Sequence, residues 1–346
     1  MNAIVSFLSS ILEFITGIVN NHGVSIIIFT ILMRLVCLPF DFKSRKGMRK
    51  MTEMQPKLNA LQKKYGNDKQ KFQQKQAELM RKEHYNPMSG CLPMLLTWPL
   101  MIAMFTAMRE IANEQLVLQA FRYLAGDENA IMAADRFLWI KNIWMTDSPF
   151  APVAPDANSL SMLTKDVWQR AYAMLTESQL LAVEQGLALV PGAVLDFTSD
   201  EAMRQSVAYI TEALNQIDVY KAAVQSVPGW TNVNFFLFSI TVFKDFNGLL
   251  ILPALAGITQ ILQTKLNPQQ NMDQNANSQK NSTANFMKWF FPVLSVFFCL
   301  TSNAGFAVYW VTSNVVMGVQ SVLITKYFDR LDQKKAKSVS GEGSVK

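Results

Sequence analysis

The chain has few of the residues on which most enzymes and metalloproteins depend. Its 346 residues include only two histidines, His22 and His84. Two imidazoles cannot supply a cluster of metal ligands together with a nucleophile relay. The sequence also lacks a Gly-rich dinucleotide loop, a Walker loop, an H-E-x-x-H motif and a G-x-S-x-G motif. We therefore expect no bond chemistry, no metal and no cofactor.

Charged residues are also scarce, while apolar residues are abundant. Charged residues make up 17% of the chain, hydrophobic residues 50% and aromatic residues 11%, with a mean hydropathy of +0.12. This composition is too apolar for ordinary soluble domains of the same length. The three cysteines, Cys37, Cys91 and Cys299, all lie in apolar runs, which favours a buried role over a disulfide framework. The composition predicts an all-α integral membrane protein.

Five apolar runs approach the length of about 20 residues that a bilayer-spanning helix requires. They lie at 24–40, 91–108, 249–262, 287–301 and 304–325. Several are shorter than that, so we expect flanking residues to complete them or the bilayer to thin locally. The stretch 4–19 is apolar but contains Glu13, and it has neither a basic start nor a small-residue cleavage site. It predicts an interfacial amphipathic helix rather than a signal peptide.

The loop charges predict the orientation in a bacterial plasma membrane. Residues 41–90 carry 13 basic and 5 acidic residues, and residues 326–346 carry 6 and 3. Residues 111–243 carry only 7 basic residues against 14 acidic ones. Because basic loops stay in the cytoplasm, we expect the N-terminus outside and the C-terminus inside.

These patterns predict a fixed order of segments along the chain. From the N-terminus, the order is an external interfacial helix at 1–22, a first span at 23–40, a cytoplasmic helical hairpin at 41–90, a second span at 91–108, an external region at 109–245 with a helical insert at about 151–230, a third span at 246–266, a cytoplasmic loop at 267–285, a fourth span at 286–301, a fifth span at 304–325 and a basic cytoplasmic tail at 326–346.

The cytoplasmic hairpin has a methionine-rich face. Helical spacings of 3, 3, 4 and 3 separate Met48, Met51, Met54, Leu58 and Leu61. A turn at 65–68 precedes a second helical stretch at 69–83. Two interpretations stay open, because such a hairpin can be a solvated basic element held by anionic lipid or an adaptable surface for binding peptides.

The external insert is predicted to be helical and to have a structural or partner-docking role. We expect one helix over 159–189, preceded and followed by prolines. Thr198 and Glu201 fit a capping box for the next helix. The apolar face of that helix is formed by Met203, Val207, Ile210, Leu214 and Ile217.

One arginine, Arg34, lies inside the first apolar run. Burying it at depth costs roughly 2.5–3.5 kcal/mol on insertion scales, so the side chain must be hydrated or paired. It either snorkels to the cytoplasm or lies in a water-filled cavity open to that side. Polar residues in other runs could line such a cavity. A helix-to-helix hydrogen bond explains any single one better, but together with Arg34 they favour a wet groove. They are Thr97, Gln260, Gln263, Thr312, Ser313 and Asn314.

Several spaced motifs resemble those of the YidC family of membrane protein insertases. They are Arg34 within 30–35, Leu38-Pro39, the hairpin with Gln55-Pro56-Lys57, Asn86-Pro87, Gly90-Cys91-Leu92-Pro93-Met94, Phe137-Leu138-Trp139-Ile140, the stretch 251–257, and 309–314 in the last span. The order is that of the family. The resemblance covers about 24–145 and 246–328, and it leaves the insert at 151–230 outside the common core.

The resemblance implies five spanning helices around a hydrophilic groove that opens to the cytoplasm. Arg34 would receive the polar tail of a substrate, and Met48, Met51, Met54 and Leu58 of the hairpin would make the first contact with it. The implied partners are nascent membrane proteins and the lipid bilayer, with the ribosome, the signal recognition particle pathway and the Sec translocon as further candidates and no direct recognition of nucleic acid. The resemblance also implies Gln260 and Trp310 as groove residues. Thr312, Asn314 and Thr97 join them as candidates because they are polar residues within the spans.

Two other functions are compatible with a polytopic membrane chain. A small-molecule transporter would carry acidic residues within its spans and inverted repeats, and the sequence has neither. A membrane scaffold would be built around the external insert, and deletion of 151–230 would separate it from an insertase.

Overall fold

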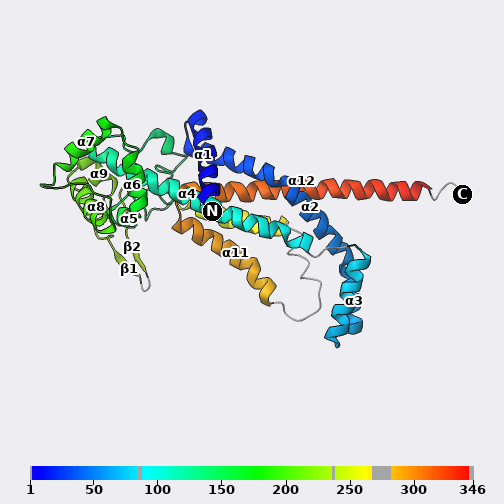
Figure 1. The fold of residues 1–346 in the computed structure, drawn as a ribbon. Coiled ribbons are helices and arrows are strands. Elements are labelled where there is room, and N and C mark those ends of the chain that lie inside the picture. The colour runs from blue at the N-terminus through cyan, green and yellow to red at the C-terminus, as the bar shows by residue number, and fades with distance from the viewer. Residues whose placement is uncertain (1, 85–87, 236–237, 267–281, 343–346) are drawn as a thin grey trace. The chain divides into compact units, whose positions relative to one another are not determined.

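The computed structural model describes residues 2–84, 88–235, 238–266 and 282–342 (Figure 1). It is mainly helical, as the composition predicts, and long helices account for most of the described chain. The long helices are α1 (Asn2–Val19), α2 (His22–Tyr65), α3 (Lys69–Lys82), α4 (Met88–Leu124), α10 (Ile251–Leu266), α11 (Ser282–Thr301) and α12 (Ala304–Glu342).

The contacts divide the chain into two compact units. The first unit contains Met1–Phe29, Ala103–Gly257 and Leu294–Val311. The second contains Thr30–Ile102, Ile258–Val293 and Thr312–Lys346. Each unit is described below by itself.

Short helices gather in the first unit (Figure 1). They are α5 (Ala157–Ser161), α6 (Lys165–Ala173), α7 (Glu177–Leu187), α8 (Asp200–Leu214) and α9 (Asp218–Ala223), with a 3-10 turn at Ala133–Asp135. The prediction of a single helix over 159–189 is therefore wrong. Thr164 and Thr176 adopt extended backbone at N-cap positions, and Thr176 forms a capping box with Gln179, so each starts a new helix.

The start of α8 differs by one residue from the prediction. Ser199, rather than Thr198, is the N-cap, and its hydroxyl accepts a hydrogen bond from the backbone N–H of Ala202 at 3.1 Å. The apolar face predicted for this helix is buried at Met203, Val207, Ile210 and Leu214. Ile217 lies beyond α8, where it is the N-cap residue of α9.

A two-stranded antiparallel hairpin adds strand structure that the all-α prediction lacks. Strand β1 (Val233–Phe235) pairs with β2 (Phe238–Ile240), with Val233 opposite Ile240. Each strand has three residues, which is too short for an alternating pattern to be recognised in the sequence.

Aromatic side chains pack the insert against α4 inside the first unit. The ring of Phe121 on α4 lies 5.8 Å from that of Trp168 on α6, and Trp168 stacks on Phe197 at 5.5 Å. Gly186 on α7 lies so close to the carbonyl of Leu124 that an added Cβ would overlap with it. The insert is therefore joined to α4 by a continuous core.

Helix α1 buries one apolar stripe and exposes another. Val5, Leu8, Leu12 and Ile15 are buried at helical spacing, whereas Phe7, Phe14 and Ile18 are exposed. A helix with apolar residues on both faces can contact protein and lipid at once.

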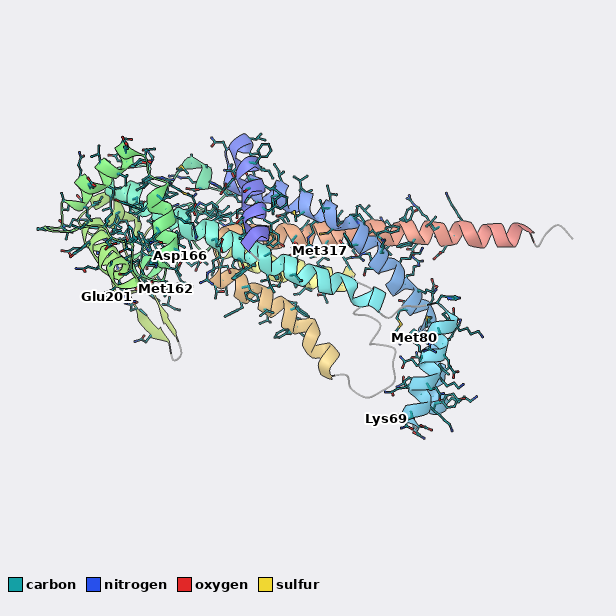
Figure 2. The ribbon with its side chains drawn as sticks, in the orientation of Figure 1. Lys69, Met80, Met162, Asp166, Glu201 and Met317 are labelled. Atoms are coloured by element: carbon teal, nitrogen blue, oxygen red, sulfur yellow. The ribbon has the colours of Figure 1, made fainter. Side chains whose placement is uncertain are left out.

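The first predicted span and the first arm of the hairpin form one helix. Helix α2 runs through Pro39 and Pro56 without ending. Asp68 caps α3 by accepting from the N–H of Lys71, and Lys57 contacts Glu83 at 2.5 Å, which places α3 beside the end of α2. Figure 2 labels Lys69 and Met80 on α3.

Two helices of the described residues are long and apolar enough to cross a membrane. They are α2 and the Ala304–Lys334 part of α12. Shorter apolar helices lie at Val5–Val19 and Trp289–Thr301. Helix α12 also includes most of the predicted tail and continues to Glu342. Most of the predicted loop 267–285 lies outside the described residues.

Candidate functional site

Arg34 is buried between α2 and α12 in the second unit. Its side chain is 7% exposed, and its Nε donates a hydrogen bond to Ser313 Oγ at 2.9 Å. Its Nη2 donates to the same oxygen. The amide of Gln320 donates to the backbone carbonyl of Arg34 at 3.2 Å. The guanidinium is thus held by a neutral hydroxyl, which fixes its position without cancelling its charge.

Further polar contacts between α2 and α12 follow toward their C-terminal ends. Arg45 Nη1 donates to Ser321 Oγ at 2.7 Å. Arg49 forms ion pairs with Asp329 at 2.8 Å and Asp332 at 2.6 Å. Asp41, one residue past the predicted first span, lies close enough to Arg34 and Arg45 for their charges to interact. This carboxyl group was not anticipated from the apolar run, which ends just before it.

The other predicted groove residues are only partly brought together. Asn314 is 4% exposed and its amide donates to Thr259 Oγ1 at 3.3 Å, while Gln260 and Thr312 are half-buried in the same unit. Trp310 belongs to the first unit, where its ring lies 5.5 Å from that of Phe306. The side chain of Thr97 on α4 lies outside the described residues.

The methionine-rich face of the hairpin is largely turned inward. Met54 is 2% exposed and Leu58 is 7% exposed, while Met51 is half-buried. The side chain of Met48 lies outside the described residues.

A buried polar network in the first unit was missed by the sequence analysis. Asp135 is fully buried and accepts a hydrogen bond from the indole N–H of Trp144 at 2.7 Å. Its Oδ1 lies 3.0 Å from His22 Nδ1, and its Oδ2 accepts from Gln119 at 3.4 Å. Asn142 extends the network through Gln119 Oε1 at 2.8 Å. No local pattern could have found this cluster, because His22 and Asp135 are far apart in the sequence.

A second buried carboxylate, that of Asp147, caps the start of α10. It accepts hydrogen bonds from the backbone N–H groups of Leu249 at 2.8 Å and Leu252 at 2.7 Å, and from the indole of Trp139 at 3.2 Å. A negative charge at a helix N-terminus is favourable because it satisfies free N–H groups and opposes the helix dipole.

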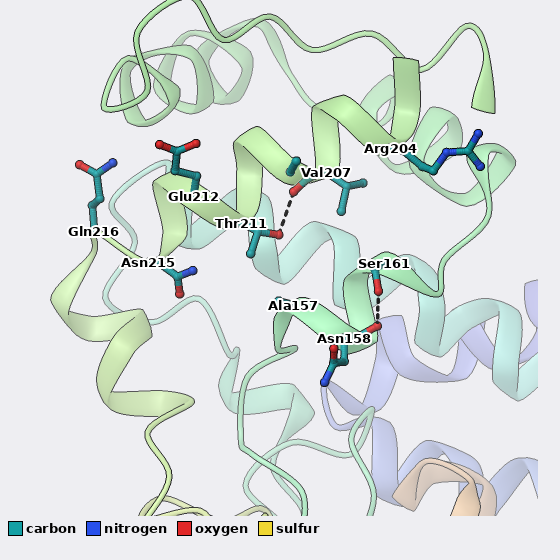
Figure 3. A pocket seen from close by; sticks show the side chains of 10 residues that line it. Ala157, Asn158, Ser161, Arg204, Val207, Thr211, Glu212, Asn215 and Gln216 are labelled. Carbon is teal, nitrogen blue, oxygen red and sulfur yellow. Dashed lines mark hydrogen bonds between the residues drawn. The ribbon is translucent and has the colours of Figure 1, made fainter. Parts of the chain in front are cut away.

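A cavity of about 750 Å³ lies in the insert, between α5 and α8 (Figure 3). Polar side chains line most of it, including Asn158, Arg204, Thr211 and Glu212. No cluster of three or more potential metal ligands occurs in the described part of the chain.

Comparison with known proteins decides the family. The model of the family described as 60Kd inner membrane protein matches residues 14–190 and 196–333, which is most of the chain. The chain belongs to this family. The match confirms the resemblance to YidC proteins, and it includes most of the insert at 151–230, which the sequence motifs had left outside the common core.

Individual members of the 60Kd inner membrane protein family match over shorter stretches. A membrane protein insertase YidC of Clostridium tetani is 33% identical over 157 residues, covering 44% of this chain and 63% of the relative. Insertases of the same name from Caldanaerobacter subterraneus and Fusobacterium nucleatum are 42% and 41% identical over 109 and 108 residues, or 32% and 31% of this chain. These two matches cover 53% of each relative. The chain thus spans less than two thirds of the length of these relatives.

Proposed function

We propose that this chain is a membrane protein insertase. In this proposal α2, α4, α10, α11 and α12 cross the membrane, with the N-terminus outside and the C-terminus in the cytoplasm. They surround a groove, open to the cytoplasm, that receives the hydrophilic tail of a substrate and releases its hydrophobic segment into lipid. Family membership and the shared name of the matched relatives support this function.

The burial and hydrogen bonding of Arg34 are the main observation in support of the proposal. Arg34 is buried on an apolar helix, and the hydrogen bonds that the described residues give its guanidinium go to the neutral hydroxyl of Ser313. The neutral hydroxyl leaves the positive charge in place, and a positive charge in a low-dielectric site attracts acidic segments. Because Asp41 lies nearby, an incoming carboxylate would compete with it for Arg34.

Insertion by this route needs no bond chemistry. A groove that reaches partway across the bilayer shortens the dry distance that a polar tail must travel. Transfer of the apolar substrate segment from water into lipid supplies the driving force. Gln260, Trp310, Thr312, Asn314 and Thr97 remain proposed groove residues.

The hairpin is proposed to meet the substrate first. Met54 and Leu58 are buried, so this role requires the hairpin to open and uncover them. Methionine suits such a surface because its flexible, polarisable side chain adapts to varied apolar sequences. The ribosome, the signal recognition particle pathway and the Sec translocon are proposed as further partners beside nascent membrane proteins and lipid.

Reconstitution tests the proposal. Vesicles containing the chain should insert a small single-span substrate without ATP, and Arg34→Ala should reduce insertion most for substrates with acidic external tails. Arg34→Lys should retain part of the activity because it keeps the charge, and Arg204→Ala, on the exposed face of α8, is the matched control. Equal insertion of every substrate by the wild type and Arg34→Ala would reject the role given to this residue.

A further inference from the structure

A narrow apolar furrow runs between α10 and α12 in the second unit. Its volume is about 290 Å³. The two helices run parallel along it, because Thr259 pairs with Asn314 at one end and the carbonyl of Leu266 accepts from Ser321 Oγ at the other. Its walls are formed mainly by the aliphatic side chains of Leu262, Leu266, Val315, Val319, Val322 and Leu323.

The polar groups in the furrow already have hydrogen-bond partners. Asn314 donates to Thr259 Oγ1 at 3.3 Å, and Gln263 Nε2 lies 3.3 Å from the sulfur of Met317, which Figure 2 labels on α12. A polar ligand would have to break these contacts. An apolar occupant leaves them intact and covers wall residues that are otherwise exposed, such as Leu323 at 61% and Leu262 at 54%.

The size of the furrow favours a hydrocarbon chain over a helix. A ten-residue helix occupies a cylinder about 10 Å wide and about 15 Å long, which is several times the volume of the furrow. Gly318 forms part of the lining, and it leaves room because it has no side chain. An unbranched acyl chain is thin enough to lie there.

Two lysines close in sequence to residues that line the furrow indicate the headgroup. Lys265 precedes Leu266 on α10, and Lys326 lies one turn beyond Leu323 on α12. Both lysines are exposed. Lysines at the end of an apolar groove suit the phosphate of an anionic phospholipid whose acyl chain occupies that groove.

We propose that the furrow between α10 and α12 is a binding site for one acyl chain of an anionic phospholipid, with the headgroup at Lys265 and Lys326. Of the residues that line the furrow, only Asn314 is also proposed for the groove around Arg34. The lipid site does not depend on insertase activity, only on the membrane location of the family.

Photo-crosslinking of the full-length chain in nanodiscs tests the proposal. The probe is phosphatidylglycerol with a diazirine on one acyl chain, and mass spectrometry locates the adducts. We expect adducts on the α10 and α12 segments that unlabelled phosphatidylglycerol displaces better than unlabelled phosphatidylcholine. This comparison uses the wild-type chain and so does not depend on the folding of any variant.

Two sets of variants separate the acyl chain from the headgroup. Gly318→Leu should abolish most adducts by filling the furrow, because a Cβ at this position meets only Leu266 Cδ1, at 3.6 Å, and the rest of the side chain has space. Gly17→Leu is the control, since a Cβ there meets nothing within 4 Å. Lys265→Gln with Lys326→Gln should lower the preference for phosphatidylglycerol by about fivefold for each lysine. As a control, Lys165→Gln with Lys221→Gln should leave the preference for phosphatidylglycerol unchanged.

Three results would overturn the proposal. They are adducts that neither unlabelled lipid displaces, equal labelling of the wild type and Gly318→Leu, and displacement of the lipid by a hydrophobic substrate segment but not by phosphatidylglycerol. The last result would assign the furrow to a protein segment instead.

Discussion

At the scale of single residues, Ser313 deserves a test because it holds the one buried arginine of α2. Replacing it with alanine leaves two N–H groups of Arg34 without their acceptor. Polar contacts between membrane helices contribute about 0.6 kcal/mol on average and up to about 1.7, so we expect Ser313→Ala to lower the free energy of unfolding within that range. Denaturation in detergent micelles measures the change.

The control for this variant is Ser10→Ala. The Ser10 hydroxyl is exposed and bonds only to a carbonyl of its own helix, that of Ser6. Ser313→Thr should restore the stability because it keeps the hydroxyl. If Ser313→Ala were as stable as Ser10→Ala, the hydroxyl would not be the group that holds the guanidinium.

Two buried tyrosines of the first unit predict a loss of stability at high pH. Burial raises the pKa of Tyr123 to about 12, with a further increase from Asp245, and burial also raises the pKa of Tyr220. Their rings lie 5.4 Å apart, and the Tyr220 hydroxyl donates to the carbonyl of Pro155. Because the pKa of Tyr123 is higher in the folded state, its protonated phenol contributes fully to the free energy of unfolding below the unfolded-state pKa of about 10. This contribution is lost as the pH rises through about 12.

We therefore expect the first unit to lose its near-ultraviolet circular dichroism between about pH 10 and 12. Tyr123→Phe should make the loss of signal with pH less steep, because phenylalanine has no hydroxyl that can ionise. Tyr209→Phe serves as the comparison, since the Tyr209 hydroxyl only accepts an exposed contact from Gln205. Identical profiles for all three proteins would show that the buried phenols do not set the alkaline limit.

At the scale of helices and strands, the start of α8 gives a test between two neighbouring residues. Ser199→Ala removes the N-cap and should cost about 0.5–2 kcal/mol of stability. Thr198→Ala should cost less, because Thr198 lies outside the helix and hydrogen-bonds only to the exposed Asp196. Thermal unfolding of the two variants, side by side, measures the difference. A larger loss in Thr198→Ala would restore the capping box expected from the sequence.

The sequence predicted the existence of the helices better than their ends. The first apolar run stops at Phe40, yet α2 continues to Tyr65, because the lysines, arginines and methionines that follow are good helix formers. Conversely, 159–189 reads as one helix but breaks twice, where Thr164 and Thr176 adopt cap geometry. The end of an apolar run therefore does not predict the end of a helix, which depends on the backbone conformation at the cap residues.

Arg34 could be found from the sequence, and Ser313 was among the polar residues expected to line a cavity around it, but the pairing of the two could not be predicted. A charged residue in an apolar run is a local signal. Its acceptor, Ser313, is 279 positions away, and only the packing of α2 against α12 brings the two together. The pairing of Asp135 with His22 and the capping of α10 by Asp147 were missed for the same reason.

At the scale of the whole molecule, the proposed orientation can be tested with two exposed positions. In a background with Cys37, Cys91 and Cys299 replaced, Met162→Cys and Lys69→Cys each provide one thiol (Figure 2). Met162 is 81% exposed on the insert, and Lys69 starts α3 of the hairpin. A membrane-impermeant maleimide should label Met162→Cys in intact cells and Lys69→Cys only after lysis. The reverse pattern would overturn the orientation derived from the loop charges.

The carboxylate of Asp147 has a consequence for how the protein is made. It is synthesised 105 residues before Leu252, whose N–H it accepts at the start of α10. At ordinary rates of translation this corresponds to a delay of roughly 5–20 s, during which the entire insert leaves the ribosome. Throughout that interval the Asp147 carboxylate lacks the backbone N–H groups of α10 and is hydrated or paired with other groups. Synonymous codons that slow translation of the insert should lengthen the time before α10 is made. The nascent chain should then be cleaved more by proteases.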